Sequence, residues 1–354
     1  MRPESRAFLN ALLTNPSVSG YEQPVQQIVR DYAGGFAQAV ETDLHGNVYA
    51  PLHGDREPRV QFAGHCDQIG FLVQHIEDSG LLRFSGVGGH DNQVVLGQEV
   101  IVYTKDGPIP GVCARKPTHL LEPDERNKIP ALHQMWIDTG YPADEVKAKV
   151  RIGDPITWRL HATDLGGGLV AATAMDDKVG VYVVMEALRL LAEDADNVQC
   201  GVWSVSTVQE EIGLRGATTS AYRVNPTVAV AADVTWATDH PDMNVGQTSP
   251  IKLGEGAVIS RGANINPVVY DLMVEAAEAE GIPYQVQAAP RGTGTDANAM
   301  QLSRGGVATG LISIPNRYMH SPVEVCAMED LDHCARLLAA FTRRVTPEVD
   351  FTPR

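Results

Sequence analysis

The spacing of apolar residues predicts alternating helices and strands at the start of the chain. Residues 4–13 and 22–33 carry apolar side chains at helical spacing, and Gly34 and Gly35 end the second segment. Residues 60–63 form a short apolar run that leads into the sequence GHCD at 64–67, which is typical of a strand and the loop after it. The first part of the chain therefore has an α/β pattern.

The pattern changes between residues 71 and 158. Short extended segments, such as those at 100–103 and 109–113, are separated there by turn signals such as Lys105-Asp106-Gly107. This region predicts a β-rich insertion.

Helices and strands alternate again after Gly168. We expect strands over 202–208, 227–234 and 307–315, and helices over 180–193, from Asn266-Pro267 to Gly281, and over 329–345. The run at 227–234 is apolar on both faces, which favours a central parallel strand covered by helices on each side. The fold class expected from these elements is α/β, with helices flanking a sheet.

Composition and charge exclude several classes of protein. A hydrophobic share of 44% with 20% charged residues is that of a globular chain. The net charge of -16 opposes binding to nucleic acids, which requires clustered lysine and arginine. The five cysteines form no CxxC pair, which favours a reducing compartment. We find no secretory signal and no apolar run of membrane-spanning length, so we expect a cytoplasmic protein without membrane contacts.

Two histidines stand at positions suited to metal binding. His65 and Asp67 share one face of an extended segment, so His65 can bind a metal while Asp67 holds its other ring nitrogen. Taken alone, the pair also fits an ordinary polar contact. His320 follows the expected strand at 307–315, although a single histidine there is commonly a structural hydrogen-bonding group.

Paired acids follow two of the expected elements. Asp176 and Asp177 lie where a glycine-rich loop approaches a helix, a place that helix-capping acids also occupy. Glu210 and Glu211 come directly after the strand at 202–208, at the edge where open α/β sheets place ligand crevices. A cation would offset the cost of burying both glutamates, and one of them could then serve as a general base. A solvated surface pair is the alternative for each.

Asp233 ends the apolar run at 228–232, which should lie deep in the sheet, and a buried aspartate requires a partner. Together, these segments resemble the M42 family of metallo-aminopeptidases, the glutamyl-aminopeptidase-like or TET peptidases. The resemblance rests on the ordered motifs GHCDQIGF, AMDDKVG, QEEIGLRGA, AADVT, GTGTDA and SIPNRYMHSPVE, which extend from residue 64 to residue 324.

The resemblance implies a fold and an assembly. Residues 1–69 and 163–354 would form a zinc-peptidase-like catalytic domain, a mixed sheet flanked by helices. Residues 70–162 would form an inserted β-rich dimerisation domain. Because relatives build hollow tetrahedra of dimers, we expect a homo-oligomer, a tetrahedral dodecamer.

The resemblance also implies a role for each motif residue. Asp176 is similar to the carboxylate that bridges two metals, with Asp177 left open as the alternative, and Glu210 is similar to the general base. Asp67 would assist catalysis from behind His65. The remaining residues resemble metal ligands: His65, Glu211, Asp233 and His320.

This arrangement predicts a two-metal aminopeptidase that acts on peptides, with a water shared by the metals as nucleophile. Histidine and carboxylate ligands suit Zn²⁺, our default expectation, and also Co²⁺ or Mn²⁺. Thr293, Gly294, Thr295 and Arg291 are candidate substrate-binding residues, and Arg261 is a second cation that could favour acidic substrates.

Trp236 and His240 depart from the family pattern after Asp233, and a coordinating role for His240 is a minor alternative. Three competing functions remain at this stage. A related di-metal carboxypeptidase or amide deacylase would use nearly the same ligands. A metal-independent glycoside hydrolase would use Glu210 and a second acid. A scaffold without catalysis would lack one of the expected groups, yet each is present.

Overall fold

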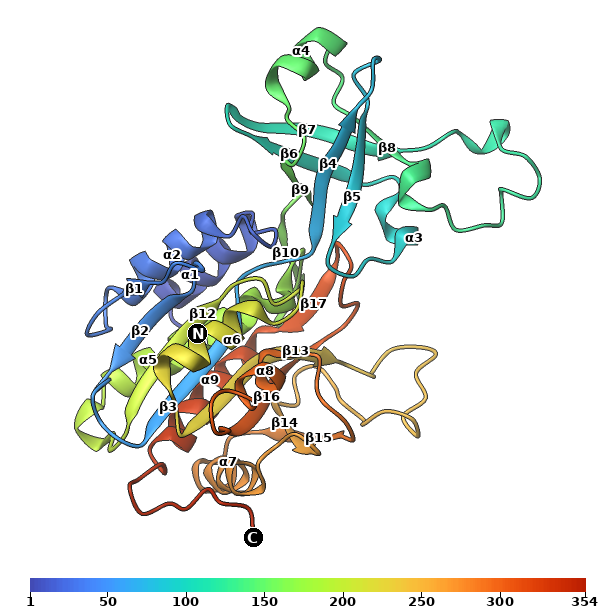
Figure 1. Cartoon of the computed structure of the whole chain (residues 1–354). Coiled ribbons are helices and arrows are strands. Elements are labelled where there is room, and N and C mark those ends of the chain that lie inside the picture. Colours follow the sequence, from blue (N-terminus) through green and yellow to red (C-terminus); the bar gives the residue numbers. More distant parts are fainter.

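The computed structural model describes residues 1–354, and an eight-stranded mixed sheet forms the centre of its larger part (Figure 1). The strands, in spatial order, are β1 (Glu41–Thr42), β2 (Val48–Leu52), β12 (Gly201–Thr207), β3 (Arg59–His65), β13 (Val228–Trp236), β16 (Ala308–Asn316), β14 (Ala257–Gly262) and β15 (Tyr284–Ala289). The four central strands β12, β3, β13 and β16 run parallel. Their carboxyl ends therefore meet at one edge of the sheet.

Helices cover both faces of this sheet. One face packs against α1 (Pro3–Thr14), α2 (Gln23–Ala33), α5 (Met175–Ala192), α7 (Pro267–Glu280) and α9 (Met328–Thr342). The other face packs against α6 (Arg215–Val224) and α8 (Asp296–Met300). Along β13, Val228 and Val230 enter the larger core whereas Ala229 and Ala231 enter the smaller one, as the period of two in a strand requires. The expected α/β fold with a flanked mixed sheet is confirmed.

Helix α7 shows how local sequence sets an element boundary. The Asn266 side chain accepts hydrogen bonds from the backbone N–H groups of Val268 and Val269, and proline occupies the first helical position. Gly281 ends the helix with φ of 59°, a conformation that glycine adopts without steric cost. Both ends agree with the sequence expectation.

The extended segments of the middle region close into a barrel. Its strands, in spatial order, are β4 (Gly70–Ile76), β5 (Leu82–Val87), β8 (Trp136–Asp138), β7 (Gly107–Ala114), β6 (Glu99–Thr104) and β9 (Pro155–Trp158). The barrel has a hydrophobic core of its own, which includes Phe71, Phe84 and Trp158, and it stands apart from the sheet in Figure 1. The short elements around it are α3 (Asn92–Val95), η1 (Thr118–Leu120), η2 (Leu132–Gln134) and α4 (Ala143–Lys149).

A three-stranded sheet lies where the chain returns from the barrel. It consists of β10 (Ala162–Gly166), β11 (Leu169–Ala172) and β17 (Glu324–Ala327), all antiparallel, and it brings the segment before α5 beside the segment before α9. The turn η3 (Ala195–Asn197) follows α5. None of the helices is both long and apolar enough to span a lipid bilayer.

Candidate metal centre

The central parallel strands bring the predicted site residues together at their carboxyl ends. His65 is the last residue of β3, Asp233 lies near the end of β13, and Glu210 and Glu211 follow β12. His320 lies in the connection from β16 to β17, on the same side. Residues far apart in the sequence thus converge because these strands share one direction.

Asp176 lies between the two histidines. Its Oδ1 is 3.2 Å from His65 Nε2, and its Oδ2 is 3.3 Å from His320 Nε2. Asp177 faces another way, because its carboxylate accepts hydrogen bonds from the backbone N–H groups of His65 and Gly180. The geometry therefore favours Asp176 as a shared ligand. The Asp177 carboxylate instead holds the backbone at the end of β3.

The other acids surround these three groups. The His65 Nε2 atom is 3.7 Å from Glu210 Oε2 and 4.0 Å from Asp233 Oδ1, and His320 Nε2 is 3.6 Å from Glu211 Oε1. Two sets of three residues have ligand atoms that all lie within 4.8 Å of one another: His65 with Asp176 and Glu211, and His65 with Glu210 and Asp233.

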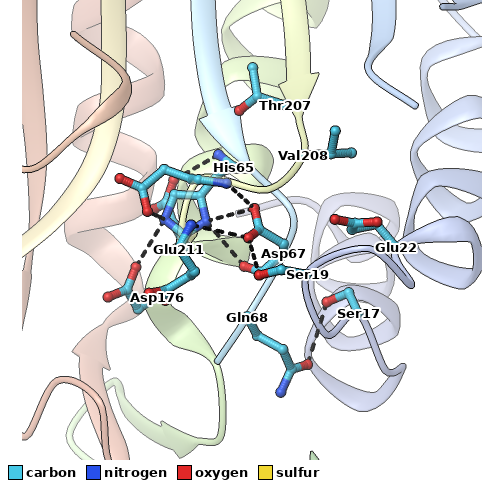
Figure 2. Close-up of polar contacts among 12 residues, drawn as sticks. Ser17, Ser19, Glu22, His65, Asp67, Gln68, Asp176, Thr207, Val208 and Glu211 are labelled. Atoms are coloured by element: carbon cyan, nitrogen blue, oxygen red, sulfur yellow. Dashed lines mark hydrogen bonds and ion pairs between the residues drawn. The ribbon is translucent and has the colours of Figure 1, made fainter. Parts of the chain in front are cut away.

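Asp67 does more than the sequence suggested (Figure 2). The closest contact of His65 Nδ1 is the backbone oxygen of Asp67 at 3.1 Å, and the Asp67 carboxylate is 3.5 Å away. That carboxylate also accepts hydrogen bonds from the backbone N–H groups of Glu210 (2.9 Å) and Glu211 (3.2 Å), and from the Ser19 hydroxyl (2.6 Å). Asp67 therefore orients the glutamate pair as well as the histidine.

A cavity of about 810 Å³ opens beside these residues. Its wall includes all four candidate substrate-binding residues: Arg291, Thr293, Gly294 and Thr295. Trp236 also lines it. Arg261 lies elsewhere, with its guanidinium 5.1 Å from the centre of the Tyr270 ring, and His240 lies against the exposed Tyr318 ring.

Comparison with known proteins supplies the family. The sequence profile described as M42 glutamyl aminopeptidase matches residues 46–337. The chain belongs to the M42 peptidase family. It is 37% identical to the lysyl aminopeptidase of Pyrococcus furiosus over 98% of this chain and 99% of that protein.

Solved structures of M42 peptidases share the whole fold. A TET aminopeptidase from a marine-sediment Thaumarchaeota archaeon superimposes with a TM-score of 0.93 at 33% identity, covering 98% of this chain and 97% of that one. The TET1 peptidase of Pyrococcus horikoshii, which assembles into a tetrahedron or a large octahedral shell, gives a TM-score of 0.85 at 31% identity, with 96% and 100% covered. The protein is thus a peptidase, as the sequence predicted.

Burial and close packing of the acids shift the pKa values of several groups in this M42 site. Burial raises the pKa of Glu210 to about 10 and that of Asp233 to about 8, and neighbouring acids add to both shifts. Burial opposes the imidazolium of His65, but the surrounding carboxylates outweigh it and raise the pKa of this histidine well above its usual range. The carboxylates of the site therefore need positive charge nearby, supplied by protons or by cations.

The residues fit divalent metal ions. All the donors are imidazole nitrogens and carboxylate oxygens, which suit Zn²⁺, Co²⁺ and Mn²⁺. Glu211 Oε1 is buried without a hydrogen-bond partner, and a bound cation would offset the cost of burying this oxygen.

Two buried acids of the site were not assigned a role from the sequence. Glu324 accepts hydrogen bonds from the backbone N–H groups of Asp176 (3.0 Å) and His320 (2.8 Å), so it links the start of α5 to the connection between β16 and β17. Asp296 accepts a hydrogen bond from the Thr207 hydroxyl at 2.5 Å. Both stand in motifs that carry the family resemblance, and that position is the signal that could have identified them.

Proposed function

We propose that this M42 peptidase is an aminopeptidase that uses two divalent metal ions to remove residues from the free amino termini of peptides. The observation that carries the proposal is the position of Asp176, whose two carboxylate oxygens each face a different histidine. A carboxylate in this position can be shared by two cations, one beside His65 and one beside His320.

Each cation would have its own set of ligands around the shared Asp176. His65 and Asp233 would complete the set on one side, and Glu211 and His320 on the other. When bound, the two ions would polarise the scissile carbonyl and make the attacking water more acidic. Zn²⁺ is the expected metal, with Co²⁺ and Mn²⁺ as alternatives.

Glu210 is the proposed general base. Burial makes its carboxylate a stronger proton acceptor than an exposed glutamate, and its Oε2 lies 3.7 Å from His65 Nε2, within the metal centre. Glu210 would take the proton from the attacking water and return it to the leaving amine. Asp67 holds the backbone of Glu210 through a hydrogen bond of 2.9 Å and so keeps the base in position.

The cavity would hold the substrate. Arg291, Thr293, Gly294 and Thr295 would contact the first residue of the peptide, while acids of the centre attract its free amine. A blocked amine would lose that attraction, so cleavage would be restricted to the amino terminus.

We also propose that residues 70–162 form an inserted dimerisation domain and that the protein assembles into a tetrahedral dodecamer of dimers. The barrel core supports the first statement, and the similarity to the Pyrococcus horikoshii TET1 peptidase supports the second. We retain the prediction of a cytoplasmic location. Light scattering that returned a monomer would contradict the assembly.

The function can be tested with a matched panel of peptides. Treatment with a chelator should abolish cleavage of an unblocked peptide, and Zn²⁺, Co²⁺ or Mn²⁺ should restore it. The same peptide with an acetylated amino terminus should be inert, whereas amidation of its carboxyl terminus should have little effect. The reverse pattern would indicate a carboxypeptidase or amide deacylase, and activity on polysaccharide that survives chelation would indicate a glycoside hydrolase.

A further inference from the structure

The two histidines of the proposed metal centre receive support from different parts of the molecule. His65 is held by Asp67, which follows it in the chain. His320 has its Nε2 toward Asp176, so its Nδ1 faces away from the centre and toward the barrel. A methyl group built on Gly89 would lie 3.4 Å from that Nδ1 atom.

Gly88 and Gly89 form a turn that connects β5 of the barrel to α3. Gly88 has φ of 78°, and a methyl group there would lie 2.5 Å from Ile69 Cγ2 and 3.3 Å from Glu211 Oε2. The turn therefore lies directly beside Glu211 and His320, the two residues proposed to bind the same ion.

The turn is fixed to the barrel core through His90. The Nε2 atom of His90 lies 2.8 Å from the carbonyl oxygen of Gly70 and 3.1 Å from that of Val87. Its ring stacks on the buried ring of Phe71, with 4.4 Å between the centroids. A displacement of the barrel would therefore move the turn with it.

We propose that the Gly88-Gly89 turn is a positioning element through which the barrel orients His320 and Glu211 and so completes one half of the metal centre. Histidines that bind metals generally need a partner on their second nitrogen, and loss of such a partner lowers metal affinity about 10- to 100-fold. The other half, beside His65 and Asp233, needs no contact from the barrel. This inference rests on the proposed two-metal function.

Two variants displace the turn in different ways. Gly88→Ala introduces the clash with Ile69 and forces a residue with a Cβ into a left-handed conformation. Gly89→Val requires no left-handed backbone, because the φ of Gly89 is not positive, and pushes a branched side chain against the His320 ring. Gly97→Ala is the matched control, since Gly97 also has a positive φ (84°) in the barrel region but has no atom within 4 Å of the added methyl group.

The measurement is calorimetric titration of metal-free full-length protein with Co²⁺, with His320→Ala as the variant that identifies the binding step involving His320. Wild type and Gly97→Ala should bind two ions alike. Gly88→Ala and Gly89→Val should leave unchanged the Co²⁺-binding step that His320→Ala does not affect. They should weaken the step that involves His320 about 10- to 100-fold. If thermal melting shows that Gly88→Ala does not fold, Gly89→Val decides.

Two results would overturn the inference: both variants binding Co²⁺ as Gly97→Ala does, or both losing the two steps equally. A wild-type protein that binds no ion would instead contradict the proposed function, so the two failures are distinguishable.

Discussion

The two sides of the metal centre are built differently. On one side His65 and Asp233 lie on strands β3 and β13, inside the sheet, and the His65 side chain is 2% exposed. On the other side His320 lies in a loop with φ of 59°, and its side chain is 36% exposed. Backbone hydrogen bonds of the sheet fix the first side, whereas the second depends on contacts from outside its own loop.

Different contacts hold the proposed metal ligands in place on the two sides. On the strand side, the pairing of β3, β12 and β13 and the contact of Asp67 with His65 hold the groups. The loop side uses Glu324, which ties His320 to Asp176, and the barrel turn at Gly88 and Gly89. Substitutions of Glu324 or of the barrel turn should therefore weaken mainly the metal-binding step that involves His320.

The largest effect is expected for Glu210→Gln. The amide has nearly the same shape but cannot accept the proton, so kcat on an aminoacyl-arylamide should fall about 10²- to 10⁴-fold. Both metal-binding steps should remain within about threefold of wild type, since Glu210 is not one of the proposed ligands. Glu255→Gln, the same change at an exposed position, is the control and should be fully active. Full activity of Glu210→Gln would show that Glu210 is not the general base.

The sequence predicted the strand side better than the loop side for a physical reason. An apolar run such as 227–234 specifies a buried strand, and Asp233 at its end has only one edge of the sheet to occupy. The role of Glu324 depends on pairing between β17 and β11, which are far apart in the chain, so its place in the family motif marks the residue but does not reveal its contacts. The contact of Gly89 with His320 is likewise set by how the barrel sits on the sheet.

The start of helix α5 was also not predicted correctly from the sequence pattern. The apolar spacing predicted a helix from residue 180, whereas the structure begins it at Met175. Asp176 and Asp177 have non-helical backbone angles inside this element, and the peptide bond between them is cis. Periodicity detects the regular part of the helix but not the irregular turn that aims Asp176 at the two histidines.

Glu324→Gln should have the next largest effect. This effect should be a loss of metal affinity on the loop side, where His320 lies. Glutamine has one acceptor oxygen in place of two, so the backbone N–H of either Asp176 or His320 would face an amide group. The binding step that involves His320 should weaken about 10- to 100-fold, and the other step should change far less. Titration with Co²⁺ measures both. Glu329→Gln, a change at an exposed glutamate on α9, is the control. Equal weakening of both steps would contradict the distinction between the two sides.

The smallest effect, a pH dependence of stability, should come from the strand side. In the metal-free protein the raised pKa values of Glu210, about 10, and Asp233, about 8, mean that both hold protons in the folded state that the unfolded chain releases above about pH 5. The raised pKa of His65 acts in the same direction above pH 6.5. Because the folded state then holds more protons on these three groups, they lower its stability as pH rises from 6 to 9. Lys178 opposes them above pH 7, because burial lowers its pKa to about 7, but it is one group against three.

Asp176 does not oppose this trend, because its pKa is lowered by hydrogen bonds from His320 and His65 that outweigh its burial, and it is ionised throughout that range. The melting temperature of metal-free protein should therefore drop by a few degrees between pH 6 and 9. Bound cations replace the protons, so protein saturated with Zn²⁺ should show a flatter profile. Asp233→Asn removes one of the titrating groups and should reduce the slope of the metal-free protein. Parallel slopes with and without metal would show that protons and cations do not compete for this centre.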